Sequence, residues 1–537
     1  MLHFAGYFVG LNVETGPLRI ILAATAWCTL RNPGITRSPR NKRSLFGMHL
    51  LTSLLLIPVF GALLIALLPG QQVRLIRTVA LAAGAAALLF SWGLLILFEP
   101  GTTGLQFVEV TPWNPRLGTS YSLGIDGISF PMVLLATLLT FIAILASANI
   151  RDRTKWYYML VLLLEAAMLG VFMAQDWTLF YLLWELTLVP LFFLIGGWGG
   201  KRRHQAALNF VLYTMGGSVF MLISLLVLFD TTPGHSFAMD TMTSGARALP
   251  VYTQVMIFLG FLIGFGVKMP IFPIHGWLPL AHVEAPSPIS ILLSGILLKM
   301  GSYGLIRAAF MLPEAMVALQ PLLAGLALFS LIYGGLLAWR QTDLKAMIAY
   351  SSVSHMGIVL LGIATLNIAG LTGAVMQMIA HGLVAGSLFL LIGLLYERTH
   401  TRDINDYSSL MQVTPRFAFF TSLALLAGMA IPGTAGFIAE LHAIIGGFEA
   451  WGWMILLISV GMMVTAAYSV RTIGRLFTGP VHSRMRDLKD LQPVELTAAG
   501  VLATGIILLG IAPQPVLELM AESIAQLSAA FTGIQGS

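Results

Sequence analysis

The chain has 537 residues, of which 57% are hydrophobic and only 10% are charged. Its single cysteine, Cys28, excludes intrachain disulfides and cysteine-ligated zinc or iron–sulfur sites within the chain. The sequence contains no dinucleotide fingerprint, no Walker A loop and no HExxH motif, so we expect no redox, nucleotide or metal centre in this chain. Apolar runs of about 20 residues, the length that crosses a bilayer, predict an all-α polytopic membrane protein.

The first part of the chain, residues 1–47, carries most of the net charge of +6. It holds six basic residues and one acid, and without it the chain has 23 bases against 22 acids. Its basic, proline-containing stretch NPGITRSPRNKRS differs from the apolar sequence that begins near Met48. We expect residues 1–47 to be an over-extended start or a non-core N-terminal segment, with a targeting or regulatory arm as the alternative.

From Met48 onward, apolar runs predict fourteen membrane spans. In chain order they lie near 50–68, 75–98, 127–147, 156–174, 177–197, 205–229, 251–269, 285–310, 315–339, 344–363, 368–394, 415–447, 452–477 and 494–512. Seventeen basic residues fall in alternate loops, beginning with the loop after the first span, and three fall in the opposite loops. Because a miscounted span would scramble this asymmetry, it supports fourteen spans with cytoplasmic basic loops.

Two of these spans are interrupted by proline and glycine. One breaks at Lys268–Met269–Pro270, and the other breaks within IPGTAGFIAEL, 431–441. The stretches GGSVFMLISLL (216–226) and AGSLFLLIGLL (385–395) match weakly at an offset of 169, close to the separation of 162 between Pro270 and Pro432. Repeated halves that each hold a broken helix are typical of transporters, although chance similarity between apolar helices is the alternative for the matched residues.

Ionisable residues inside the spans are the candidate functional groups. A cation near the bilayer centre costs roughly 2.5–3.5 kcal/mol, so such residues usually face a polar interior. They are Glu165, Glu185, Lys268, Lys299, Lys345, His355, His381 and Glu440. Glu185 and Lys268 are natural partners, and a lysine whose carboxylate partner comes and goes can take up and release a proton. The alternative is a set of static ion pairs and satisfied core histidines that only hold helices together.

Other polar residues lie beside the first break and at the ends of spans. His275, His282 and Glu284 flank the first break, but Pro279 between them and the membrane context argue against a metal site, and the histidines are candidates to feed a proton relay. Asp126 and Asp176 lie at span ends, where we expect them to cap helices or anchor loops.

The stretch GFGVKMPIFPIHGWLPLAHVEAPSPISILLSGILLKMGSYGLIR, 264–307, is similar to the core signature of the antiporter-like subunits of NADH–quinone oxidoreductase (complex I). DLKAMIAYSSVSHMGIV (343–359) and GTAGFIAEL (433–441) match the same family. The resemblance covers Met48 to the C-terminus and implies fourteen helices with two inverted five-helix repeats, helices 4–8 and 9–13, in which helices 7 and 12 are broken. The implied division is 48–155 for helices 1–3, 156–310 and 311–477 for the repeats, and 478–537 for helix 14 and the tail.

The resemblance also implies roles for the ionisable residues. Glu185 and Lys268 resemble the proton-loading pair, Lys299 the central lysine, and Glu440 the exit residue. His355, His381, Lys345 and Glu165 are implied as a supporting relay. Glu440 and the short C-terminal tail point to subunit M, because the L- and N-type subunits and cation/proton antiporter homologues usually have lysine at the position of Glu440.

The implied function is outward proton pumping in a bacterial inner membrane, coupled to NADH oxidation and quinone reduction in partner subunits. NADH, FMN, iron–sulfur clusters and quinone are expected in those partners, which include L- and N-type subunits. Membrane lipid, but no nucleic acid, is expected to contact the chain. The alternatives are a subunit of a multi-subunit cation/proton antiporter, a subunit of a membrane-bound hydrogenase or formate hydrogenlyase, and a non-conducting scaffold.

Overall fold

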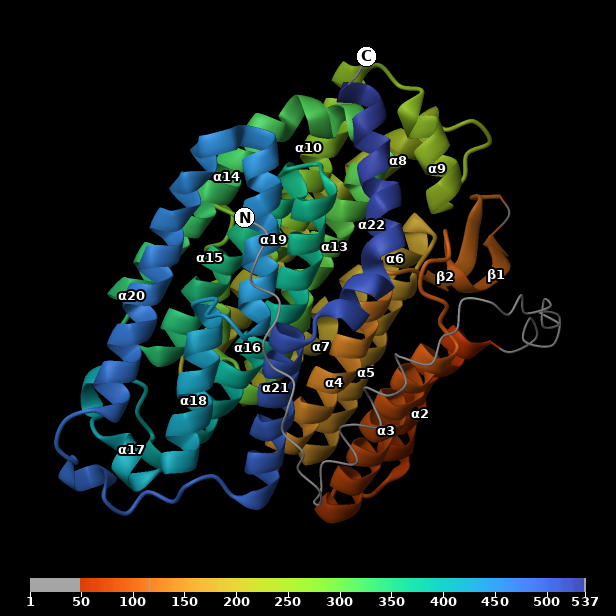
Figure 1. Cartoon of the computed structure of the whole chain (residues 1–537). Coiled ribbons are helices and arrows are strands. Elements are labelled where there is room, and N and C mark those ends of the chain that lie inside the picture. The colour runs from red at the N-terminus through yellow and green to blue at the C-terminus, as the bar shows by residue number, and fades with distance from the viewer. Residues whose placement is uncertain (1–48, 115, 536–537) are drawn as a thin grey trace, which may run out of the picture. The chain divides into compact units, whose positions relative to one another are not determined.

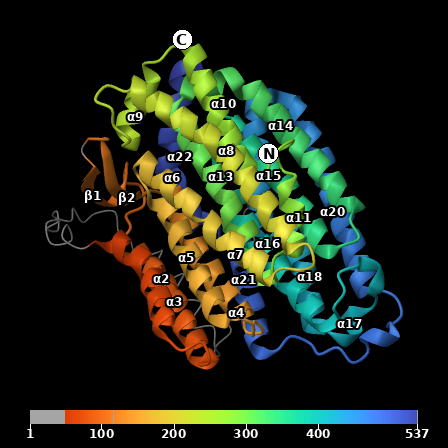
Figure 2. The same ribbon diagram turned by 180° about the vertical axis from the view of Figure 1, so that it is seen from behind.

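The computed structural model describes residues 49–114 and 116–535, and the description below concerns these residues. Residues 1–47, for which an over-extended start is predicted, lie outside them. The unit Leu50–Ser537 is a helical bundle with one β-hairpin (Figures 1 and 2).

The long apolar runs form helices because a chain in lipid must satisfy its own backbone N–H and C=O groups. The helices are α2 (Leu50–Leu67), α3 (Val73–Gly93), α4 (Ser129–Ala146), α5 (Thr154–Met173), α6 (Trp177–Leu186), α7 (Leu188–Trp198), α8 (Arg203–Thr231), α9 (Met239–Arg247), α10 (Val251–Lys268), α11 (Trp277–Glu284), α12 (Ser287–Leu292), α13 (Leu298–Met311), α14 (Pro313–Arg340), α15 (Leu344–Ala364), α16 (Ile368–Thr399), α17 (Leu410–Val413), α18 (Pro415–Gly428), α19 (Ala435–Trp451), α20 (Leu457–Phe477), α21 (Pro493–Ile511) and α22 (Gln514–Gln535). The strands are β1 (Gln106–Asn114) and β2 (Thr119–Ile125), which pair antiparallel.

By length and composition the described residues contain thirteen candidate membrane spans rather than fourteen. The difference arises at Ala435–Phe477, which counts as one continuous stretch of 43 residues. The chain reverses direction within this stretch, between α19 and α20 (Figure 1), where Gly452 adopts a φ of 58°. Helix α18, with 14 residues, is too short to span alone and forms the first piece of the broken span that α19 completes. The predicted all-helical membrane fold is confirmed.

Both predicted helix breaks are present. Helix α10 ends at Lys268 and α11 begins at Trp277, while α18 ends at Gly428 and α19 begins at Ala435. Each intervening segment contains proline, which supplies no backbone donor and so leaves helical carbonyls free. Such irregular backbone at membrane depth is tolerated only where protein or water surrounds it. At the first break the protein itself supplies other donors: Gly266 O accepts from Ile271 N at 3.0 Å, and Val267 O accepts from the Trp277 ring N–H at 2.8 Å.

Two further interruptions were not predicted. The predicted span 177–197 is interrupted at one residue, Thr187, between α6 and α7, because Pro190 lacks an N–H and its ring clashes with the carbonyl of Leu186, four residues earlier. The span after α11 contains a π-helical turn over Leu293–Leu297, between α12 and α13. Single π-helical turns occur frequently at functional sites.

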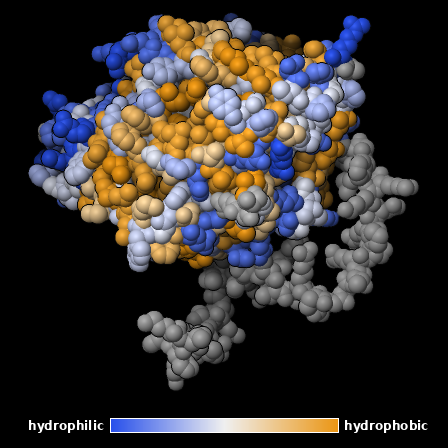
Figure 3. Space-filling model, turned by 90° about the horizontal axis from the view of Figure 1, so that it is seen from above, coloured by the Kyte–Doolittle hydropathy of each residue, from blue (hydrophilic) through white to orange (hydrophobic). Residues whose placement is uncertain are grey.

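The middle of the bundle is formed by α12–α13 and α16, whose most apolar stretches are wholly buried. Other spans, such as α8, turn large apolar side chains outward, and Figure 3 shows apolar residues over much of the surface seen from above. Such a surface is typical of a protein solvated by lipid chains.

The two ends of the bundle differ in charge and structure. Hydrogen bonds tie the predicted basic loops to one another: Arg77 to Ile150, Lys155 to Leu68, Arg153 to Gly197, Arg402 to Val283 and Arg398 to Lys489. We call this end the basic-loop face. The opposite end carries β1, β2, α9 and α22 (Figures 1 and 2), and we call it the hairpin face. There Ser523 of α22 accepts a hydrogen bond from Gly127 N at 3.0 Å.

The hairpin also holds the first helix. Buried Glu109 on β1 accepts hydrogen bonds from the N–H groups of Leu51, at 2.7 Å, and Thr52, at 3.2 Å, in the first turn of α2. A carboxylate at a helix N-terminus satisfies free donors and complements the helix dipole.

We expect Glu109→Gln to destabilise this junction by about 1–2 kcal/mol, because a neutral amide accepts these hydrogen bonds less strongly. The measurement is amide hydrogen exchange of Leu51 and Thr52 in the purified protein, which should accelerate. Glu99→Gln, at an exposed position, is the control. Equal exchange in the two variants would contradict the role assigned to Glu109.

Candidate proton-transfer site

Lys268 and Glu185 each lie next to an interruption of a helix: Lys268 at the end of α10, and Glu185 two residues before Thr187. Lys268 is the last residue of α10 and is 1% exposed, and its Nζ donates a hydrogen bond to Thr187 Oγ1 at 2.9 Å. The same Nζ lies 4.0 Å from the centre of the Trp184 ring. Glu185, next to Trp184 on α6, interacts electrostatically with Lys268. The predicted pairing of Glu185 with Lys268 is therefore compatible with this geometry, although Thr187 is the direct hydrogen-bond partner.

A close backbone contact brings α10 to α13, the helix that carries the next lysine. A Cβ on Gly301 would lie 2.6 Å from Met269 N and 2.7 Å from Phe265 O, so only glycine fits. Lys268 and Lys299 each lie within two residues of this contact. Among the described residues no side chain hydrogen-bonds to both lysines, so proton transfer between them requires water.

Lys299 begins a line of four ionisable side chains from four helices. Its Nζ lies 2.6 Å from His381 Nδ1 on α16 and donates to the carbonyl of Ser294 at 2.7 Å. The rings of His381 and His355, on α15, have centroids 5.6 Å apart. His355 Nδ1 lies 3.7 Å from Glu440 Oε1 on α19. The structure thus brings together the predicted central lysine, both relay histidines and the predicted exit residue.

Local backbone geometry explains the contact between Lys299 and His381. A Cβ on Gly295, in the π-helical turn, would lie 3.6 Å from Gly382 O, and a Cβ on Gly382 would lie 3.0 Å from Gly295 O. The small residues therefore let α16 approach the turn next to His381. The π-helical turn also presents the Ser294 carbonyl that accepts from Lys299.

The tautomer of His381 follows from this contact. A lysine ammonium has only donors, so when Lys299 is charged His381 Nδ1 must accept and the ring hydrogen is on Nε2. His381 Nε2 is buried without a hydrogen-bond partner among the described residues. A proton received at Nδ1 can thus be matched by release from Nε2, which is how a histidine passes a proton across its ring.

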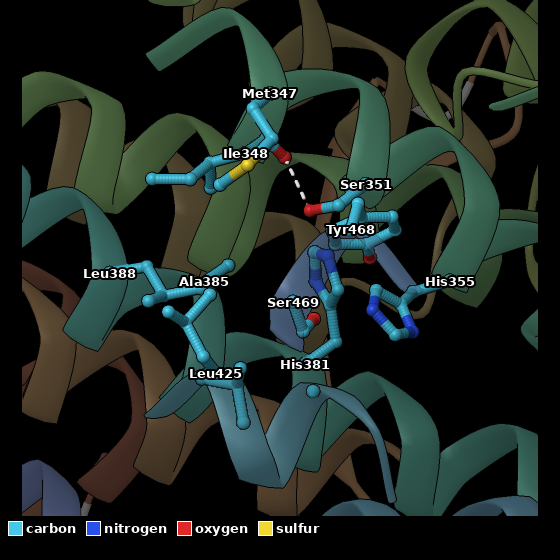
Figure 4. Close-up of a pocket in the computed structure, with 12 residues that line it drawn as sticks. Met347, Ile348, Ser351, His355, His381, Ala385, Leu388, Leu425, Tyr468 and Ser469 are labelled. Atoms are coloured by element: carbon cyan, nitrogen blue, oxygen red, sulfur yellow. Dashed lines mark hydrogen bonds between the residues drawn. The ribbon is translucent and has the colours of Figure 1, made fainter. Parts of the chain in front are cut away.

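A small polar cavity lies beside the two histidines. It is lined by His355, His381, Ser351, Tyr468 and Ser469, with apolar side chains on its other side, as Figure 4 shows. Its volume of about 10 Å³ is close to the minimum that admits one water molecule. Water there could join the two rings, which do not hydrogen-bond to each other directly.

Lys345 and His282 lie between this line and the basic-loop face. Lys345 Nζ donates to the carbonyl of Ala285 at 2.9 Å and is 3% exposed. His282, fully buried, stacks on Phe389 at 4.6 Å and interacts electrostatically with both Lys345 and Lys299. Neither nitrogen of His282 has a hydrogen-bond partner in the described part of the chain. His282 therefore lies within electrostatic range of both lysines, beside the break where the sequence analysis named it as a candidate to feed a relay.

Glu165 is separate from the line. It lies on α5, 0% exposed, and both carboxylate oxygens lack hydrogen-bond partners among the described residues. An isolated charge in such a place is very costly, so a carboxyl there is expected to hold a proton. Its depth is nonetheless similar to that of Glu185. At about 1.5 Å per residue, the two lie about 16 and 14 Å from the α5–α6 turn at Asp176.

Asp176 and Asp126 cap helices as predicted. Asp176 accepts from the N–H of Thr178 at 2.9 Å at the start of α6, and Asp126 accepts from the N–H of Ser129 at 2.9 Å at the start of α4. Within the described residues no three His, Cys, Asp or Glu side chains form a group able to hold a metal ion. Glu284 instead accepts from Arg202 N at 2.8 Å.

Comparison with known proteins adds a family context. The family described as NADH:quinone oxidoreductase/Mrp antiporter, TM, matches residues 174–465. The chain is 44% identical over 476 residues to NAD(P)H-quinone oxidoreductase chain 4 1 of Synechococcus elongatus, covering 86% of this chain and 88% of that relative. A chain in the structure of respiratory complex I from Thermus thermophilus with bound NADH matches with a TM-score of 0.81 and 31% identity, covering 89% of this chain and 99% of that chain. A chain of the Mrp complex from a Dietzia species matches with a TM-score of 0.76 at 24% identity, over 90% of this chain and 52% of that chain, a likeness of fold alone.

Proposed function

Because the chain belongs to the antiporter-like subunit 4 family of NADH:quinone oxidoreductase (complex I), we propose that it is the proton-translocating membrane subunit of such a complex. The expected resemblance to this family is confirmed. Glu440, in place of the lysine usual in the L- and N-type subunits, supports the more specific assignment to subunit M. The observation that carries the function is the line Lys299–His381–His355–Glu440, because each step joins groups able to hold a proton.

In this proposal Glu185 and Lys268 load a proton from the cytoplasm. When the two ions pair, Lys268 keeps its proton, and when they separate, the buried ammonium becomes costly and releases it. Lys299 receives the proton through water and passes it to His381, His355 and Glu440, which releases it on the outer side. Lys345, with His282, supplies the line from the basic-loop face. Glu165 stores a proton at about the same depth in the membrane as Glu185.

NADH oxidation and quinone reduction are assigned to partner subunits that hold FMN, iron–sulfur clusters and quinone. L- and N-type subunits and lipid are the proposed neighbours in the membrane arm. We place the complex in a bacterial inner membrane with the basic-loop face toward the cytoplasm, which the charge asymmetry of the loops supports.

The alternatives make different predictions. An antiporter subunit would exchange protons for cations without NADH. This alternative is the less favoured one, because the chain is 24% identical to the Mrp chain but 44% identical to an oxidoreductase chain. A hydrogenase-type subunit would respond to hydrogen or formate. A scaffold would need no line of proton-holding groups across four helices. Proton uptake by membrane vesicles with NADH as donor decides among them, and no uptake by the unmodified complex would contradict the proposal.

The proposal predicts that Glu440→Gln lowers NADH-driven proton uptake about tenfold or more, because an amide keeps the shape of the carboxyl but cannot ionise. The measurement is protons translocated per NADH in vesicles, with assembly of the complex checked in parallel. Glu449→Gln, at an exposed position on the same helix, is the control and should pump normally. Normal pumping by an assembled Glu440→Gln complex would indicate a purely structural carboxyl.

A further inference from the structure

A cavity of about 550 Å³ lies between the hairpin face and the loading pair. Its walls come from α9, α13, α22, the start of α6 and the turn before α4, and they include Asp126, Trp177, Arg247, Arg307 and Leu527. Arg247 is exposed, so the cavity is accessible from the hairpin face. Its volume is large enough for many water molecules. Solvent from this face can therefore approach the interior of the first repeat.

An ion pair lies in the wall of this cavity. Arg307 Nη2 is 2.7 Å from Asp126 Oδ2, and the two side chains are 16% and 10% exposed. Burial alone would raise the pKa of the Asp126 carboxyl, but the Arg307 guanidinium and the N–H groups of Ser129 and Ile128 outweigh it and hold this pKa below its ordinary value. Asp126 is therefore ionised at neutral pH, and a guanidinium does not give up its proton in proteins. The pair therefore holds a fixed guanidinium charge in the cavity wall.

A layer of aromatic rings lies between this cavity and Lys268. Trp177, in the cavity wall, packs on Phe180 with centroids 5.2 Å apart, and Phe180 stacks on Trp184 at 5.8 Å. Trp184 is the ring that contacts Lys268. Phe265 packs on both Phe180 and Trp184, at 6.1 and 5.5 Å. All four rings are at most 1% exposed, so the layer is close-packed, and none of them carries an ionisable group.

Tyr303 lies between Lys299 and the cavity-wall residue Arg307 on α13. Lys299, Tyr303 and Arg307 are four residues apart on α13 and so share one face of the helix. Tyr303 packs against Phe180 at 6.5 Å, and its hydroxyl donates to the carbonyl of Phe172 at 3.1 Å. The Arg307 guanidinium lies 4.9 Å above the Tyr303 ring.

We propose that the Arg307–Asp126 pair, the aromatic layer of Trp177, Phe180, Trp184 and Phe265, and Tyr303 beside this layer together form a proton barrier. This barrier isolates the loading pair and Lys299 from the cavity at the hairpin face. This inference rests on the proposed function, since a barrier is needed only if the two lysines carry protons. Apolar constrictions and fixed guanidinium groups exclude protons from membrane pores. The barrier would leave the line through His355 and Glu440 as the route outward.

The test uses the whole purified complex in proteoliposomes and two variants, Phe180→Ala and Arg307→Gln. Phe180→Ala opens room for water in the layer, and Arg307→Gln removes the fixed charge. Two quantities are measured: the decay of an imposed pH gradient without NADH, and protons translocated per NADH oxidised. We expect the passive leak to rise about tenfold and the protons per NADH to fall, while quinone reductase activity per assembled complex changes by less than about twofold.

Three controls accompany these variants. Phe180→Leu should keep the barrier, because leucine refills the apolar space. Phe229→Ala removes a ring that stacks on Phe237 at 4.4 Å, outside the layer, and should not leak. Glu495→Gln breaks another ion pair, with Arg398 at 2.5 Å, which is not at the cavity, and should not leak either.

Each remaining outcome overturns the inference. If the imposed pH gradient decays no faster in both assembled variants than in the unmodified complex, neither the ring nor the ion pair excludes protons. A parallel loss of pumping and quinone reduction without a leak would place the Arg307–Asp126 pair on the outward route instead. Failure of the proposed function itself would be seen separately, as normal pumping by Lys268→Met.

Discussion

Replacement of Lys268 with methionine is expected to abolish NADH-driven proton uptake and to lower quinone reductase activity about a hundredfold, the usual scale for loss of a proton-transfer group. Methionine keeps the unbranched shape of lysine, one atom shorter, but has no ammonium group, so Glu185 loses its electrostatic partner and Thr187 loses its donor. Both measurements are made on vesicles from the same preparation, normalised to assembled complex. Quinone reduction falls as well because redox chemistry and proton movement share one free-energy change in a coupled machine.

The matched control for this variant is Lys201→Met, at an exposed position of the basic-loop face, which should pump and reduce quinone normally. Thr187→Val should have a smaller effect than Lys268→Met, because it removes a hydrogen-bond acceptor but leaves the charge and the contact with Trp184. An intact Lys268→Met complex that pumps at the normal ratio of protons to NADH would contradict the loading role and favour a scaffold.

The second large effect is expected at the contact between Lys299 and His381. Lys299→Met and His381→Leu each remove one side of the 2.6 Å contact, and each should abolish proton uptake and lower quinone reductase activity about tenfold or more. Since both residues serve one step, the quinone reductase activity of the double variant should be no lower than that of the more severe single variant. This non-additivity distinguishes a shared transfer step from two independent structural losses.

The measurements for this cycle are protons per NADH and quinone reductase activity in the two single variants and the double variant, each normalised to assembled complex. Lys489→Met, exposed at the basic-loop face, is the control for a change of lysine to methionine. Additive losses, with assembly intact, would mean that Lys299 and His381 act in separate steps and that the observed contact is incidental.

Much of the fold could be predicted because its rules are simple. The length of the apolar runs and the placement of basic residues in alternate loops predicted the spans, and Pro270 and Pro432 predicted the two broken helices. The interruption at Thr187 was not predicted although Pro190 signals it, because the apolar run continues through the proline to residue 197. The π-helical turn before Lys299 has a fainter signal, the pair Ser294–Gly295, since serine and glycine pairs accompany many helix irregularities.

The sequence predicted which residues belong to the candidate site better than it predicted which of them are in contact. The cost of burying a charge identifies Lys268, Lys299 and Glu440 without any structure. Contacts among these residues depend on how helices distant in the sequence pack together. A single sequence does not reveal this packing. Thus Glu165 is implied as part of the relay, yet it has no hydrogen-bond partner among the described residues. His282, considered first for a metal and then as a feeder of the relay, lies within electrostatic range of two lysines that would repel a cation.

The π-helical turn has a consequence for how this helix could have arisen. A π-helical turn holds one residue more than the regular helix would, so all residues after it are rotated by about 100° relative to an uninterrupted α-helix. Lys299 follows the turn directly. An ancestral helix shorter by one residue between Leu293 and Leu297 would have aimed this lysine away from His381. A one-residue insertion, with no change in any charged residue, would then suffice to connect two separate proton-binding groups.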